Sequence, residues 1–246
     1  MFGRLIRSNW NCLWIILVIV MAPAATSAQD LDAKLAQRAD FVPATGNVRE
    51  QLVQVAQYYK IPMGIEWVLQ PEEKQVKLVA GQAPTVGALL NLILQATPDY
   101  SITVRRGVVN VSDRRYAVDS RNFLNLKIGR FSLTKANVFD AEAKLRRTIH
   151  ATLHPERFVA GTNGGYGYGV PDENGFDVQN ISFSGKDFTV RDILDRIILS
   201  NGNTLWVVNI APSTMMKNEP FFAPFEANQV TDFAWRIVPF NKSTQQ

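Results

Sequence analysis

Two segments of the chain share one hydrophobic pattern. The first begins after Thr85 and the second after Thr189, and in each the apolar residues recur at i, i+3, i+4, i+7 and i+8. This spacing predicts a helix with one continuous apolar stripe. Either Thr can cap its helix, and Asp192 completes a capping-box-like pattern in the second segment. Such a recurrence predicts an internal duplication. The stripe positions are Val86, Leu89, Leu90, Ile93 and Leu94, and Val190, Ile193, Leu194, Ile197 and Ile198.

Each of these helices has an earlier companion. One companion begins at Asn47 and its counterpart begins at Asn137, and both continue with apolar residues on one face. The two companions are closer together in the sequence than the two striped helices, so the second copy must hold extra residues between its helices. The Gly- and Tyr-rich segment 161–175 lies in this interval. Surface loops tolerate insertions of this kind.

Segments typical of strands fill the gaps between the predicted helices. In the first copy, two of them flank the turn 105–107 and predict a hairpin. Gly81 and Gly185 each lie four residues before a capping Thr, where a strand-to-helix turn is expected. The predicted strands are residues 61–68, 75–79, 100–104 and 108–111 in the first copy, 123–133, 176–183 and 205–210 in the second, and a late strand at 233–238.

These elements predict an α+β fold of two tandem βαββαβ-like modules, each with two amphipathic helices packed on a small mixed sheet. A signal peptide at 1–28 and a linker at 29–39 precede the modules. Module 1 is expected at 40–118 and module 2, with its loop insertion, at 119–210. A C-terminal extension that includes the late strand follows at 211–246.

The N-terminus has the order of a secretory signal peptide. Arg4 and Arg7 precede an apolar run at 13–22, and small residues follow it. This order predicts export with cleavage after Ala28, and therefore a periplasmic or secreted protein. The alternative is an N-terminal membrane anchor, although the apolar run is well short of the roughly 20 residues that span a bilayer.

Composition narrows the classes of function. The chain has 246 residues, 46% of them apolar, and 26 Lys and Arg against 22 Asp and Glu. This balance is typical of a folded protein, and there is no basic run of the kind that binds nucleic acid. The single cysteine, Cys12, lies inside the predicted signal. The expected mature chain therefore excludes a disulfide framework, a cysteine nucleophile and a cysteine-ligated metal.

Motifs of the first copy carry a family resemblance. They are FVPA at 41–44, the helix at 47–59, IPMGIEW at 61–67, VKL at 76–78, the helix at 85–94 and the hairpin at 100–111. Together they resemble the short N-terminal module of secretins and TonB-dependent receptors, over about residues 40–112 and more loosely over 121–210. The resemblance implies a periplasmic domain that docks other proteins and packs against neighbouring subunits. Since no pore, receptor plug or β-barrel follows, we expect a free-standing periplasmic adaptor.

Two histidines are candidate metal ligands. His150 and His154 stand four residues apart at the end of a predicted helix, a spacing that places both imidazoles on one face. Pro155 follows at once, and no acid lies between the histidines. Surface histidines near a helix C-terminus, where positive charge is favourable, are the preferred interpretation. We therefore expect no metal site, and we also expect no cofactor and no catalytic residue.

The Gly-rich segment carries Tyr166 and Tyr168. A phosphate-binding loop would need a following helix and a Lys-Ser/Thr pair, whereas Asp172 and Glu173 follow here and would repel a phosphate. Interleaved Tyr and Gly suit an adaptable contact surface, so Tyr166 and Tyr168 are candidates for binding a partner. The alternative is an insertion without a role.

The remaining charged and aromatic residues have structural interpretations. The acid pair at 72–73 is expected to be solvated loop charge, and the basic pairs at 105–106 and 146–147 are expected to be solvated arginines. Core packing is expected for the tryptophans on predicted strands. These are Trp67, Trp206 and Trp235.

The sequence predicts a non-enzymatic protein-interaction module of the cell envelope, a prediction at the level of the fold. The expected partners are envelope proteins and no nucleic acid, with membrane contact only through a partner. Exposed sheet edges, which can accept a strand, and the loop with Tyr166 and Tyr168 are the expected binding surfaces. Two alternatives stay open: a ligand-binding protein or enzyme with a cleft between the modules, and a self-assembling component that forms homo-oligomers.

Overall fold

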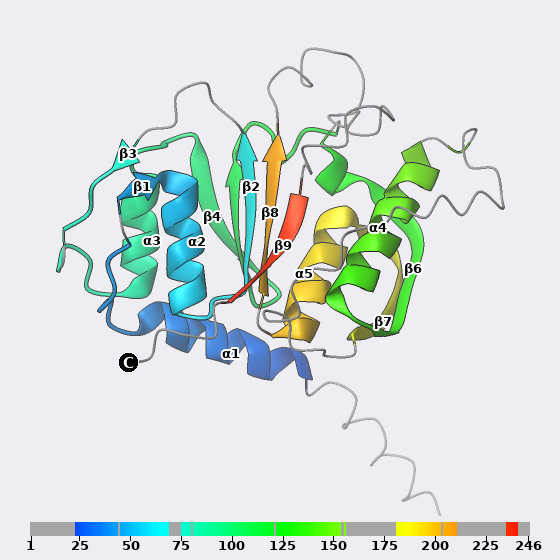
Figure 1. Ribbon diagram of the computed structural model, residues 1–246, viewed down its shortest axis with the longest axis horizontal. Helices are drawn as coiled ribbons and strands as arrows, with labels where there is room; N and C mark the ends of the chain where they lie inside the picture. The colour runs from blue at the N-terminus through cyan, green and yellow to red at the C-terminus, as the bar shows by residue number, and fades with distance from the viewer. Residues whose placement is uncertain are drawn as a thin grey trace, which may run out of the picture.

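The computed structural model has an α+β fold, as the sequence predicts (Figure 1). It describes residues 23–43, 45–68, 75–79, 81–120, 122–153, 155, 181–202, 204–210 and 235–240. The helices are α1 (Pro23–Ala36), α2 (Val48–Tyr58), α3 (Val86–Leu94), α4 (Val138–Leu153), α5 (Val190–Asn201) and the short 3-10 helix η2 (Phe123–Asn125). The strands are β1 (Gly46–Asn47), β2 (Met63–Val68), β3 (Gln75–Val76), β4 (Tyr100–Arg105), β5 (Val108–Asp113), β6 (Lys127–Ala136), β7 (Ile181–Thr189), β8 (Thr204–Ile210) and β9 (Trp235–Pro239).

Side-chain caps fix where the helices begin. Asn47 Oδ1 accepts the backbone N–H of Glu50 at 2.9 Å, and the Glu50 carboxylate accepts the N–H of Asn47 at 3.2 Å. Thr85 caps α3 through its side chain. Asn137 Oδ1 accepts the N–H of Asp140 at 2.8 Å. These bonds satisfy donors that the first helical turn leaves free, and they confirm the predicted helix starts.

A five-stranded mixed sheet forms the centre of the fold, in the order β4-β5-β2-β8-β9. β2 runs parallel to β5 and β8, and the outer strands β4 and β9 are antiparallel to their neighbours. β8, which the sequence assigns to the second copy, therefore lies directly beside β2 of the first (Figure 1). The predicted late strand is present as β9 and pairs with β8.

Both faces of the central sheet are buried. α2 and α3 lie on one side of it, α4 and α5 lie on the other, and α1 runs across the lower end of the sheet in this view (Figure 1). Along β2, Met63 and Ile65 pack in the cluster that contains the stripe of α3, whereas Val68 packs in the cluster that contains the stripe of α5. Burial on both faces explains the near-continuous apolar runs of these strands. The two stripes thus pack on opposite sides of one sheet, and the division into two tandem modules stays a prediction.

A separate antiparallel pair, β6 and β7, packs against α4 and α5. Gly185 lies within β7, opposite Phe131, so the expected strand-to-helix turn at this glycine is wrong. The physical reason is a close approach: a Cβ at position 185 would overlap the ring of Phe188. Gly81, by contrast, lies in a turn with φ +83°, as expected of a glycine that ends one element and precedes another.

Helix α1 packs on the first group of helices. Residues 29–36, which the sequence assigns to a linker, are helical, and Leu31 is buried with the α2 and α3 stripes. A Cβ on Gly87 of α3 would lie 3.3 Å from the carbonyl oxygen of Leu35, which shows how closely the two helices approach. The predicted cleavage site after Ala28 falls inside α1. No helix in the part of the chain that the structure describes combines the length and apolar character needed to cross a bilayer.

Candidate functional site

Strand β4 lies at one edge of the central sheet, and its last three residues are exposed. A two-residue turn joins it to β5, and both turn residues have positive φ: Arg106 at 50° and Gly107 at 82°. This is the conformation of a type I′ hairpin turn, which matches the twist of the flanking strands. The hairpin register runs from Arg105 opposite Val108 to Tyr100 opposite Asp113.

The hairpin geometry decides which main-chain groups of β4 are available. Residues that flank a two-residue hairpin turn exchange hydrogen bonds, and the pattern then alternates along the strand. Arg105, Thr103 and Ser101 therefore direct their main-chain groups toward β5, whereas Val104 and Ile102 direct theirs away from it. Among the described residues, no strand pairs with this outer side of β4.

The side chains of β4 leave this edge open. Val104 is 50% exposed, Thr103 is exposed, and Ile102 is half-buried. The strand contains no proline and only one charged residue, Arg105, at its end. Natural edge strands are usually blocked by proline, by charge or by a bulge. β4 lacks these features over most of its length, so its outer side can accept another strand.

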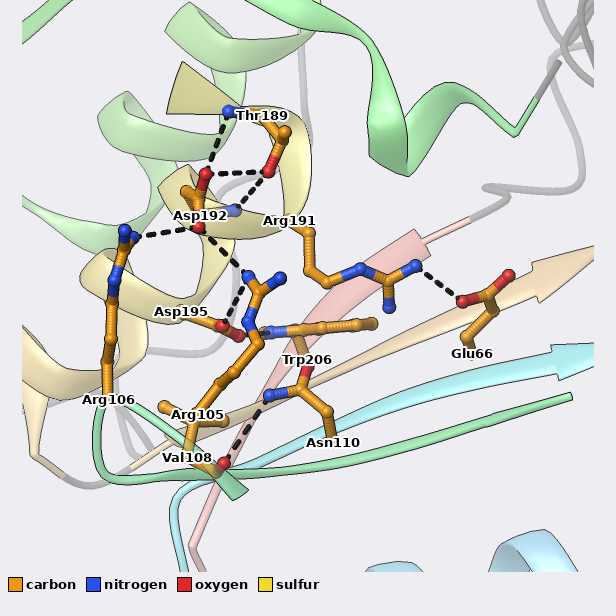
Figure 2. A network of polar contacts seen from close by, with 10 residues as sticks. All are labelled: Glu66, Arg105, Arg106, Val108, Asn110, Thr189, Arg191, Asp192, Asp195 and Trp206. Carbon is orange, nitrogen blue, oxygen red and sulfur yellow. Dashed lines mark hydrogen bonds and ion pairs between the residues drawn. The ribbon is translucent and has the colours of Figure 1, made fainter. Parts of the chain in front are cut away.

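A carboxylate of helix α5 fixes the tip of this hairpin (Figure 2). Asp192 Oδ1 accepts hydrogen bonds from Arg105 at 2.9 Å and from Arg106 at 2.8 Å. Its other oxygen accepts the N–H of Thr189 at 3.0 Å and the Thr189 hydroxyl at 2.8 Å, as in a capping box. Burial alone would raise the pKa of Asp192, but the Thr189 hydrogen bonds and the two arginines outweigh it and lower the pKa.

The sequence predicts that these two arginines are simply solvated. The structure shows instead that they also form ion pairs. Arg105 is 43% exposed and Arg106 is 57% exposed, yet both bind the same carboxylate. Arg105 also lies 3.6 Å from Asp195 Oδ2, one turn further along α5. We call this group, made of Arg105, Arg106, Asp192 and Asp195, the hairpin clamp.

Asp195 connects the hairpin clamp to the centre of the sheet. It is 1% exposed, and its Oδ1 accepts the indole N–H of Trp206 on β8 at 2.9 Å. Burial raises the pKa of Asp195 to about 6, against the opposing effects of the Trp206 hydrogen bond and of Arg105. The Trp206 indole lies over Gly64 of β2, where a Cβ would overlap the ring.

A buried ion pair joins α5 to β2. Arg191 donates to Glu66 Oε2 at 2.7 Å, and the Asn122 side-chain amide donates to Glu66 Oε1 (Figure 2 shows the ion pair). Glu66 is fully buried and Arg191 is 6% exposed. Burial raises the pKa of Glu66, and Arg191 acts in the opposite direction. Residue 66 stands in an otherwise apolar strand, which is the one sequence signal that could have indicated a buried polar contact.

Two buried carboxylates with raised pKa values are also what an enzyme site can contain. Here, however, Glu66 and Asp195 are at most 1% exposed, and each is hydrogen-bonded to a buried partner. Structural ion-pair networks perturb pKa values in the same way. The arrangement links α5, β2, β8 and the β4–β5 hairpin, so its direct effect is to hold the edge strand in place.

A shallow hollow lies where α1, the hairpin tip and the end of α5 meet. Its lining residues are Asp30, Leu31, Lys34, Pro62, Gly107, Leu199 and Gly202. The two charged residues bind each other, because Lys34 Nζ lies 2.9 Å from Asp30 Oδ2. A ligand site needs polar groups that converge on a bound molecule, and none of the buried carboxylates of α5 or β2 lines this hollow.

Of the remaining sequence candidates at 150, 154, 166 and 168, the structure describes only His150. His150 is in the last turn of α4, whereas His154, Tyr166 and Tyr168 lie outside the described residues. Across the described part of the chain, no group of three or more His, Cys, Asp or Glu side chains is arranged to hold a metal ion. The expected core positions of Trp67 and Trp206 are confirmed. For Trp235 the structure describes only the backbone of β9.

Sequence reasoning anticipated an exposed sheet edge but missed the hairpin clamp. The clamp depends on contacts between residues more than eighty positions apart, for which local patterns carry no signal. Comparison of the chain with family models, with curated proteins and with solved structures finds no match.

Proposed function

We propose that this protein is a non-enzymatic interaction module of the cell envelope that binds a partner protein by strand addition at β4. In this binding mode an extended strand pairs with an exposed sheet edge, so that main-chain hydrogen bonds supply affinity and the side chains supply specificity. The single observation that carries the proposal is the open outer side of β4, with Val104 half exposed.

The hairpin clamp supports the same proposal. A flexible edge would lose conformational entropy when it is ordered by a partner, and a rigid edge avoids that cost. Arg105 and Arg106 tie the end of β4 to Asp192 at distances below 3 Å. β4 is therefore preorganised for strand pairing.

The predicted signal peptide and the resemblance to the short N-terminal module of secretins and TonB-dependent receptors add further support. Both indicate a periplasmic or secreted protein, and the resemblance implies a docking role. Removal of residues 1–28 would cut off the first part of α1 and leave residues 29–36, including Leu31, to pack in the core. The partners we expect are envelope proteins, and membrane contact would occur through such a partner.

The test uses four forms of the full chain to capture envelope proteins: the wild type, Val104→Pro, Val104→Thr and Tyr166→Ala/Tyr168→Ala. Proline at this position removes an N–H that points away from β5, so it blocks strand addition without removing a bond of the existing ladder. Threonine keeps the N–H and the β-branched shape and is the matched control. We expect wild type and Val104→Thr to capture the same partner and Val104→Pro to lose it, with far-UV circular dichroism unchanged.

Tyr166 and Tyr168 in the Gly- and Tyr-rich segment are the alternative docking site that the same experiment tests. If Val104→Pro still captures the partner while Tyr166→Ala/Tyr168→Ala loses it, the partner binds the Gly- and Tyr-rich segment and the role of β4 is refuted. If all forms capture the same protein equally, neither surface is the docking site.

A further inference from the structure

We infer that the strand added to β4 is the β4 strand of a second copy of this chain, paired antiparallel about a two-fold axis at Thr103. The inference rests on the proposed function and names its partner. It is carried by the self-complementarity of the edge, which concerns main-chain groups, side chains and charge.

The main-chain groups restrict the register. Only Ile102 and Val104 direct N–H and C=O groups outward from the well-formed part of β4, because the N–H of Tyr100 already donates to the carbonyl of Thr97 at 3.0 Å. An antiparallel pair needs outward groups on both strands to face each other. With the axis at Thr103, Ile102 of each copy lies opposite Val104 of the other, and all four residues contribute hydrogen bonds.

The neighbouring registers are less favourable. Moving the axis to Ile102 places Val104 opposite Tyr100, whose N–H is already used. Moving it to Val104 places Ile102 opposite Arg106, a charged turn residue with φ of 50°. Only the register centred on Thr103 uses every outward group and leaves the turn free.

The side chains fit the same register. Alternate residues of a strand share a face, so Ile102 and Val104 lie on the face that carries the α3 cluster, to which Ile102 contributes. Pairing Ile102 with Val104 of the second copy covers apolar surface that is exposed in one copy, since Val104 is 50% exposed. Thr103 meets Thr103 on the opposite face, and Thr–Thr pairs are favourable across strands.

The charged side chains of β4 do not oppose the pairing of two β4 strands. Arg105 is the only charged residue of β4, and in this register it lies opposite Ser101 of the second copy rather than another arginine. Its charge is already compensated by Asp192 at 2.9 Å and by Asp195 at 3.6 Å. No like charges therefore face each other across the interface. Since both copies use the same edge, the pairing closes as a dimer and joins the two five-stranded sheets into one.

A cysteine cross-link tests the register directly, because the chain has a single cysteine, Cys12, which can be replaced by Cys12→Ser. In that background Thr103→Cys brings two thiols together across a non-hydrogen-bonded pair, where Cα atoms are about 4.5 Å apart. The matched control is Ser101→Cys. Its two copies lie about 13 Å apart along the strands, beyond the roughly 7 Å that a disulfide spans. We expect a disulfide-linked dimer from Thr103→Cys and its loss from Ser101→Cys.

Sedimentation supplies the second measurement. Wild type and Val104→Thr should reach twice the monomer mass as concentration rises, and Val104→Pro should stay monomeric with an unchanged circular dichroism spectrum. A wild type that remains monomeric, or cysteine variants that cross-link equally or not at all, would overturn the second-copy inference. The proposed function would survive that result if Val104→Pro still abolished capture of a different envelope protein, and it would fall if capture were independent of β4.

Discussion

Arg106, at the tip of the β4–β5 hairpin, lies 2.8 Å from Asp192 in the first turn of α5, although 86 positions separate them in the chain. Arg105 contacts the same carboxylate oxygen, and the second oxygen caps α5 through Thr189. One carboxylate therefore fixes both a helix start and a hairpin tip. Its removal should loosen two elements at once.

Replacing Asp192 by Asn should lower the free energy of unfolding by about 1–2 kcal/mol at neutral pH, because a cap and two charge-assisted bonds are weakened. The pKa of Asp192 is lowered in the folded protein, so its stabilisation is present above the ordinary pKa of 3.8 and is lost as pH falls through the folded-state value. Urea unfolding of both forms at neutral and acidic pH measures this. The difference should shrink as pH falls, and a constant difference would contradict the assignment.

The control for this prediction is Asp187→Asn on β7. Asp187 is exposed and has φ of 55°, a conformation that Asn tolerates. We expect a change within about 0.5 kcal/mol, as for most surface substitutions. An equal loss in both variants would mean that net charge, rather than the hairpin clamp, is responsible.

Asp195 should have the opposite pH dependence. Burial raises its pKa to about 6 in the folded protein, so the folded state holds a proton that the unfolded state has released, and stability falls as pH rises from about 4 to about 6. Asp195→Asn keeps an acceptor for Trp206 and removes the buried charge. The free energy of unfolding of Asp195→Asn should therefore depend less on pH in this range. Relative to wild type it should rise by up to about 2–3 kcal/mol as the pH goes from acidic to neutral.

Asp195→Leu separates the charge from the hydrogen bond. It also removes the charge but leaves the indole N–H of Trp206 without an acceptor, which costs about 1–3 kcal/mol for a buried donor. Urea unfolding at pH 4 and pH 7, followed by tryptophan fluorescence, compares the three forms. If Asn and Leu behave alike, the Trp206 hydrogen bond does not contribute.

The predicted elements differ in how far local sequence determines them. The helix starts at Asn47, Asn137 and Thr189 follow from side chains that bind the backbone three residues later, and such signals are visible in the sequence. The neighbours of each strand are not local. Gly64 pairs with Trp206 across the β2–β8 ladder, and nothing in either strand indicates that they meet.

The contacts of Glu66 and of the two hairpin arginines could not be predicted from the sequence for the same reason. Glu66 is conspicuous in an apolar strand, but its partner Arg191 lies in a helix turn where charged residues are ordinary. The arginines at 105–106 look like a solvated hairpin tip until α5 is placed beside them. Sequence could therefore predict that an edge exists, but it could not predict what holds that edge in place.

The Glu66–Arg191 ion pair gives a prediction of its own. Removing one partner of a buried pair leaves an uncompensated charge and costs about 3–5 kcal/mol. Arg191→Met should be destabilising by about that amount, whereas Glu66→Gln/Arg191→Met should recover much of the loss because no charge stays buried. A double-mutant cycle in urea measures the coupling. Additive losses would show that the two side chains do not act as a pair.

Gly64 gives the sharpest test of the central sheet. A Cβ at this position would overlap the indole of Trp206, which is fully buried and held through its N–H by Asp195 at 2.9 Å, so the ring cannot easily move aside. Overpacking a core usually costs about 1–3 kcal/mol, and Gly64→Ala should reach the upper end. Gly129→Ala is the control, because a Cβ there meets no atom within 4 Å.

A rescue experiment shows whether the overlap itself is the cause. Trp206→Leu alone should destabilise the protein by creating a cavity. In Gly64→Ala/Trp206→Leu the added methyl group enters that cavity, so the combined loss of unfolding free energy should be smaller than the sum of the two single losses. Strictly additive losses would mean that Gly64 and Trp206 are not in contact. In that case β8 would not lie beside β2, and the order of the central sheet would be refuted.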